Sequence, residues 1–115
     1  MKATEESWQH SRMPGQREQM ALDRRYTASE YEHLAEGEIP RVQDDRWFIW
    51  VGDDHVVHVH RSWTGFEIYE VRLQPCTDGY EVAEAWVNGD PAQYERNPGM
   101  DVALLGPMLD RLAGR

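Results

Sequence analysis

Four short strand-like segments lie between residues 46 and 87, and they constrain the fold more than any other feature of the sequence. Each is rich in aromatic or β-branched residues, and each gap holds residues typical of turns, such as glycine, serine or aspartate. The segments are Arg46–Val51, His55–His60, Phe66–Leu73 and Tyr80–Val87. Parallel pairing needs connections of a dozen or more residues, so these short gaps predict a four-stranded antiparallel meander.

Helices are expected on either side of these strands in the sequence. A capping-box pattern beginning at Thr27 predicts a helix over residues 28–36. After the strands, an aspartate followed by proline predicts one or two helical turns over residues 91–96. A last helix is expected to be capped by Asp101, with Pro107 either bending it or marking its start. The pattern predicts an α+β fold whose N-terminal helix and C-terminal helices pack on one face of the sheet.

The length and the distribution of apolar residues favour one domain. A chain of 115 residues can bury a core without disulfides or metal. Residues 1–25 are polar and contain few apolar side chains, which predicts a flexible or loosely ordered tail with at most a short helix over residues 16–25. Residues 26–115 then form a single α+β domain, and deletion of the tail is expected to change the melting temperature by only a few degrees.

Charge and cysteine content argue against several classes of function. The chain has 21 acidic and 12 basic residues, a formal net charge of -9, which disfavours nucleic acid and anionic membranes as partners. It has one cysteine, no signal-peptide pattern and no apolar run long enough to span a membrane, so a cytoplasmic location is expected. Gly-rich phosphate loops, paired cysteines and nucleophile-elbow motifs are also absent from the sequence, and the identity of any cofactor is unknown from the sequence.

Two histidines on the second strand are candidates for a site. Side chains alternate across a strand, so His58 and His60 should share one face while Val57 and Val59 point into the core. Two imidazoles in this arrangement can converge on a metal ion, and nearby side chains could complete its shell: Asp53, Asp54, His55, Glu67 and Glu70. No third ligand has a spacing that demands a metal, so the sequence favours ordinary surface histidines and we predict no metal site.

The turn at residues 61–65 has an unusual composition. Arg61 offers a planar fork for phosphate or carboxylate, and the hydroxyls of Ser62 and Thr64 could assist it. Gly65 is expected at a positive φ or at a close approach of another backbone. The alternative is an ordinary hairpin loop, in which the hydroxyls bond their own backbone and Trp63 folds back onto the sheet.

These features predict a binding surface on one face of the sheet. The candidate ligand-binding residues are Arg46, Trp50, His58, His60, Arg61, Ser62, Trp63, Thr64, Gly65 and Tyr69. The favoured hypothesis is a small binding module that presents this face to a protein partner or a small anionic ligand. The alternative is a small enzyme that uses His58, His60 and Arg61 on a phosphate- or carboxylate-bearing, nucleotide-like substrate. Enclosure around histidines with perturbed pKa values would favour the enzyme.

Part of the chain resembles a known family. The RWFI sequence that begins at Arg46, the HRSWTG sequence that begins at His60 and the preceding segment Glu38–Val42 are similar to a family of small uncharacterised bacterial proteins. The resemblance extends from Tyr26 to Leu112. It implies an association with genes that handle ADP-ribose or nucleotides, and it implies no particular activity.

Overall fold

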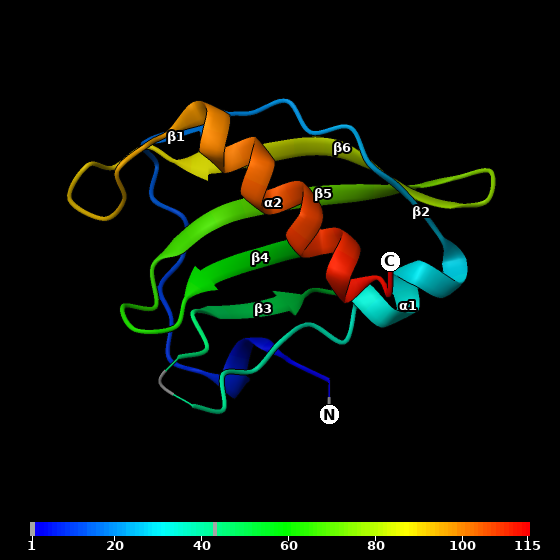
Figure 1. Cartoon of the computed structure of the whole chain (residues 1–115), viewed down its shortest axis with the longest axis horizontal. Helices are drawn as coiled ribbons and strands as arrows, with labels where there is room; N and C mark the ends of the chain where they lie inside the picture. The colour runs from blue at the N-terminus through cyan, green and yellow to red at the C-terminus, as the bar shows by residue number, and fades with distance from the viewer. Residues whose placement is uncertain (1, 43) are drawn as a thin grey trace.

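The computed structural model describes every residue except Met1 and Gln43. Among these residues it contains a six-stranded antiparallel sheet, two α-helices and one 3-10 turn (Figure 1). In chain order the elements are the 3-10 turn Glu5–Ser7, β1 (Arg17–Gln19), β2 (Arg25–Thr27), α1 (Ala28–Leu34), β3 (Trp47–Val51), β4 (Val56–Arg61), β5 (Glu67–Cys76), β6 (Gly79–Asn88) and α2 (Pro98–Leu112). The α+β class and the antiparallel sheet are confirmed.

Strands β3 to β6 form the meander that the sequence predicted. Each strand pairs with the next in antiparallel register, and the order across the sheet is β1-β6-β5-β4-β3. In this register Trp50 lies opposite His58, and His58 lies opposite Glu70. Side chains from three neighbouring strands therefore meet near His58.

The sheet has two more strands than predicted, and both come from the segment preceding α1. Strands β1 and β2 pair with opposite ends of β6 and cover its outer edge. The short helix considered over residues 16–25 is wrong. Met20, Leu22 and Tyr26 recur at even spacing, the period of a half-buried strand, and Tyr26 is fully buried. The sequence also predicted that residues 1–25 are flexible or loosely ordered. This statement concerns their mobility, and it stays a prediction.

The helices differ from the predicted set at the C-terminus. Helix α1 begins with the predicted capping box at Thr27. There is one C-terminal helix, and Asn97 rather than Asp101 caps it by accepting a hydrogen bond from the backbone N–H of Met100. Asp101 lies inside the first turn with its side chain buried. Residues 91–93 form only a turn, in which the backbone of Asp90 accepts from Tyr94.

Helix α2 crosses one face of the sheet and buries the main core (Figure 1). Leu105 and Leu109 of α2 lie in the same buried cluster as Val57, Val59 and Tyr69 of the sheet. This surface is called the helix face below. No helix among the residues described is both long and apolar enough to cross a membrane.

The opposite surface of the sheet is called the histidine face, and the N-terminal segment (residues 2–15) lies against it. The indole N–H of Trp8 donates to the backbone oxygen of Ser62 over 2.8 Å. The ring of His10 lies 5.9 Å from that of Phe48 and 5.0 Å from that of His60, centroid to centroid. The sheet therefore lies between α2 and a segment with no α-helix.

Candidate functional site

The alternation predicted for β4 is confirmed. Val57 and Val59 are fully buried in the core beneath α2, so the side chains of His58 and His60 point to the histidine face. The two imidazoles differ in their surroundings, because His60 has no exposed surface and the side chain of His58 is 16% exposed. They therefore have different roles.

His60 is fixed by hydrogen bonds on both ring nitrogens. The indole N–H of Trp50 donates to Nε2 over 3.0 Å, so Nδ1 is the protonated nitrogen and donates to the backbone oxygen of Gly65 over 3.1 Å. Burial lowers the pKa of His60 to about 4, and the neighbouring His10 and His58 act in the same direction. His60 is neutral at pH 7 and joins β3, β4 and the following turn.

His58 lies between an aromatic ring and a buried carboxylate. Its ring stacks on that of Trp50, with centroids 4.0 Å apart and an interplanar angle of 14°. Its Nδ1 is 3.2 Å from each carboxylate oxygen of Glu67, whose side chain is only 2% exposed. The ring therefore has a fixed plane and a fixed direction.

A β-bulge places Glu67 on the same face as His58. Val59 pairs with Tyr69 and His60 with Glu67, so β5 contains one extra residue, Ile68, between these partners. Regular alternation would put Glu67 and Glu70 on opposite faces because they are three residues apart. The extra residue restores the parity, and one ligand atom from each of His58, Glu67 and Glu70 lies within 4.8 Å of the other two.

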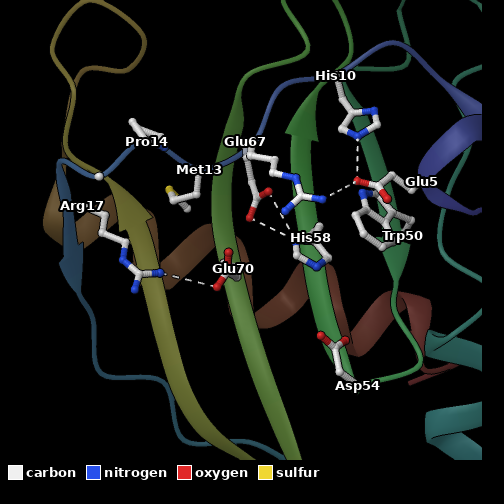
Figure 2. A pocket seen from close by; sticks show the side chains of 12 residues that line it. Glu5, His10, Met13, Pro14, Arg17, Trp50, Asp54, His58, Glu67 and Glu70 are labelled. Carbon is white, nitrogen blue, oxygen red and sulfur yellow. Dashed lines mark hydrogen bonds and ion pairs between the residues drawn. The ribbon is translucent and has the colours of Figure 1, made fainter.

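These side chains line a cavity of about 520 Å³ between the histidine face and the N-terminal segment (Figure 2). Figure 2 shows Glu67, Glu70 and His58 converging above the sheet, with Arg17 reaching Glu70 from the neighbouring edge. The lining residues are Glu5, His10, Arg12, Met13, Pro14, Gly15, Arg17, Trp50, Asp54, His58, Glu67 and Glu70. The cavity has an acidic, aromatic floor on the sheet and a rim formed largely by the N-terminal segment.

The electrostatics of this cavity are dominated by carboxylates. Burial raises the pKa of Glu70, and the adjacent Glu67 carboxylate raises it further, while His58 and Arg17 oppose the shift. The two arginines are paired with rim or floor acids, Arg17 with Glu70 at 3.5 Å and Arg12 with Glu5 at 3.6 Å. The floor thus holds two carboxylates in close proximity, an arrangement that a positive charge would stabilise.

The predicted binding residues do not all share this face. Trp50, His58 and His60 are brought together as expected. Arg61 lies on the helix face, with its guanidinium 5.1 Å from the ring of Trp47, and Tyr69 also faces α2. The expected grouping of His58, His60 and Arg61 is therefore not formed.

The turn residues have mainly structural contacts. The Thr64 hydroxyl accepts from the backbone N–H of Phe66 within the turn, as in an ordinary hairpin loop. The Ser62 hydroxyl instead donates to the backbone oxygen of Asp45, in the connector that precedes β3. Gly65 has a φ of 78°, which confirms the predicted positive φ. Trp63 is 69% exposed and lines a shallow hollow with Trp8, Pro40 and Val42. Arg46 is exposed, and its backbone oxygen accepts from Ser62.

Sequence reasoning missed the contribution of the N-terminal segment. Glu5, His10, Arg12 and Arg17 line the cavity, yet all four lie in the stretch predicted to be a tail. Glu67 and Glu70 were considered only as nearby side chains that could complete a metal shell. No local signal in residues 2–15 indicates which face of the sheet they cover, because this depends on contacts with strands more than 30 residues away in the chain.

Comparisons of this chain with family models, with curated proteins and with solved structures found no match. The resemblance to small bacterial proteins with an HRSWTG core stays an expectation, as does the association with ADP-ribose or nucleotide genes that it implies. The geometry of the cavity is therefore the basis for inferring a function.

Proposed function

We propose that this protein is a small binding module whose cavity on the histidine face takes a positively charged ligand. The observation that supports it most directly is the convergence of Glu67 and Glu70 beside His58 at the cavity floor. Placing two carboxylates together in a partly buried site costs free energy, and a cation between them offsets that cost.

This proposal keeps the binding module expected from the sequence and changes its ligand. A small anion was expected because Arg61 was placed beside the histidines, and Arg61 lies on the helix face. The arginines that do line the cavity, Arg12 and Arg17, are each already paired with a glutamate. A protein partner stays a prediction, for which the exposed Trp63 and Val42 offer an apolar surface.

Thermal unfolding in the presence of small ions tests whether the ligand is positively or negatively charged. We expect 1,4-diaminobutane to raise the melting temperature in a concentration-dependent way, whereas inorganic phosphate does not, since a ligand stabilises the state that binds it. The double variant Glu67→Gln/Glu70→Gln should lose the response. The double variant Glu81→Gln/Glu84→Gln is the matched control, because both residues lie on β6 outside the cavity. If phosphate raises the melting temperature and 1,4-diaminobutane does not, the ligand is an anion and this proposal is overturned.

A second candidate function is acid–base catalysis, favoured by the contact between Glu67 and His58 Nδ1. A carboxylate on one ring nitrogen orients an imidazole so that the other nitrogen can transfer a proton. Hydrolysis of p-nitrophenyl acetate and p-nitrophenyl phosphate tests this candidate. His58→Phe should lower turnover by about 100-fold. If turnover by the unmodified protein does not exceed that of this variant, the candidate is rejected.

A further inference from the structure

The three side chains at the cavity floor have the chemistry and spacing of a metal site. We infer that His58, Glu67 and Glu70 bind one divalent transition-metal ion such as Zn²⁺ or Mn²⁺. This inference rests on the proposed function, because it identifies the positive charge that the cavity takes.

Distances at the floor are compatible with a single bound ion. Two ligand atoms at about 2.1 Å from one ion stand about 3.0–3.4 Å apart at octahedral to tetrahedral angles. His58 Nδ1 is 3.2 Å from both oxygens of Glu67, within this range. The third ligand, Glu70, lies within 4.8 Å of the other two.

The ligand types select the class of metal. An imidazole nitrogen with two carboxylates suits Zn²⁺, Mn²⁺ or Fe²⁺, whereas Ca²⁺ and Mg²⁺ prefer oxygen ligands alone. Three protein ligands leave at least one coordination position, and all three proposed ligands line the cavity. The ion could therefore hold water or a further small ligand within the cavity.

Neighbouring residues orient these ligands as the outer shell of a metal site does. Trp50 stacks on the ring of His58, and Arg17 pairs with Glu70 at 3.5 Å. Trp50 is itself held in place, because its indole N–H donates to Nε2 of the buried His60. Such partners limit the movement of ligands, and their loss typically lowers metal affinity 10–100-fold.

Calorimetric titration of the full chain with ZnCl₂ and MnCl₂, after removal of metal with a chelator, tests this inference. We expect one ion to bind per chain, with weaker binding of MgCl₂ and CaCl₂. His58→Phe keeps a ring against Trp50 and removes both nitrogens, while Glu67→Gln and Glu70→Gln keep the side-chain volume. Each should lower the affinity by at least about tenfold, since losing a ligand costs no less than losing an outer-shell partner.

Matched controls distinguish this site from adventitious binding. His33→Phe and Glu84→Gln alter a histidine and a glutamate outside the cavity and should leave the affinity unchanged. The inference is overturned if neither ion binds, or if the affinity is the same in His58→Phe and Glu70→Gln as in the unmodified chain. Glu70 is partly exposed, so its variant remains informative even if Glu67→Gln fails to fold. A response to 1,4-diaminobutane without metal binding would overturn only the metal site, and the proposed function would stand.

Discussion

Each face of the sheet buries a carboxylate, but the surroundings of the two carboxylates differ. On the helix face, Asp101 accepts hydrogen bonds from the hydroxyls of Tyr69 and Tyr94 and from Arg96 Nε. On the histidine face, Glu67 has His58 at 3.2 Å, with the carboxylate of Glu70 beside it. Asp101 lies in a closed network with three donors, whereas Glu67 lines a cavity of about 520 Å³.

This difference separates a structural carboxylate from a candidate ligand. A buried charge that is fully hydrogen-bonded stabilises one packing arrangement and has no capacity for a further partner. A buried charge with fewer donors and a like-charged neighbour is stabilised when a cation is added. Substitutions on each face, a change of pH and removal of the N-terminal segment test whether the two faces differ in this way.

The largest effect is expected when Asp101 is removed. Asp101→Ala removes the acceptor of the buried Tyr69 hydroxyl, of the partly buried Tyr94 hydroxyl and of Arg96 Nε, and should lower the free energy of unfolding by about 3–5 kcal/mol. Glu67→Gln should cost about 1 kcal/mol or less, because the amide keeps the volume and the repulsion with Glu70 is relieved. Urea denaturation of both variants measures the difference. Equal losses would show that Glu67 is as structural as Asp101.

Acid should destabilise the protein through the histidine face. The pKa of His60 is about 4 in the folded chain and about 6.5 when unfolded, so protonation favours unfolding. Its contribution is fully present above pH 6.5 and is lost as the pH falls to 4, at most about 3 kcal/mol. On the helix face, burial raises the pKa values of Tyr69 and Tyr94, so these hydroxyls stay protonated throughout.

Urea denaturation at several pH values between 7 and 4 measures this loss. The variant His60→Phe should be less stable at pH 7 but should show a flatter dependence on pH. If the free energy of unfolding depends on pH equally in both proteins, His60 is not the source of that dependence.

Removal of the N-terminal segment should affect one face more than the other. A chain that starts at Met13 lacks Trp8, which donates to Ser62, and His10, whose ring lies against those of Phe48 and His60. It should lose about 2–3 kcal/mol, the value of burying one aromatic side chain. This is more than the composition of the segment led us to expect. Hydrogen exchange should show the loss of protection in β3 and β4. Unchanged stability would agree with the sequence-based expectation of a loosely ordered tail.

The smallest effect is expected at Gly65, where the turn meets this segment. The φ of 78° disfavours a side chain, and a Cβ atom there would lie 2.9 Å from His10 Cα. Gly65→Ala should cost about 1–2 kcal/mol in the full chain. The chain that starts at Met13 lacks His10, so only the backbone strain remains and Gly65→Ala should lower the free energy of unfolding by less. If Gly65→Ala lowers the free energy of unfolding equally in both chains, the N-terminal segment does not constrain the turn.

Local patterns in the sequence were sufficient for the strands and for several details of the site. The spacing of aromatic and β-branched residues predicted β3 to β6, and Thr27 predicted the start of α1. Alternation placed Val57 in the core and His58 on the opposite face. Applied one step further, the same rule places Arg61 with the valines, where the structure has it. These features follow from backbone geometry over a few residues.

Long-range contacts decided the rest. The bulge at Ile68, which puts Glu67 beside His58, depends on how β5 pairs with β4. Residues 17–19 and 25–27 become edge strands because β6 offers unpaired backbone groups about 60 residues away. The cavity exists because residues 2–15 cross the histidine face, and their composition alone gives no preference for either face. The sequence by itself determined which residues form strands and which side of β4 is apolar, since these depend on local periodicity. Only the tertiary structure decided which polar side chains converge, because that depends on pairing between distant segments.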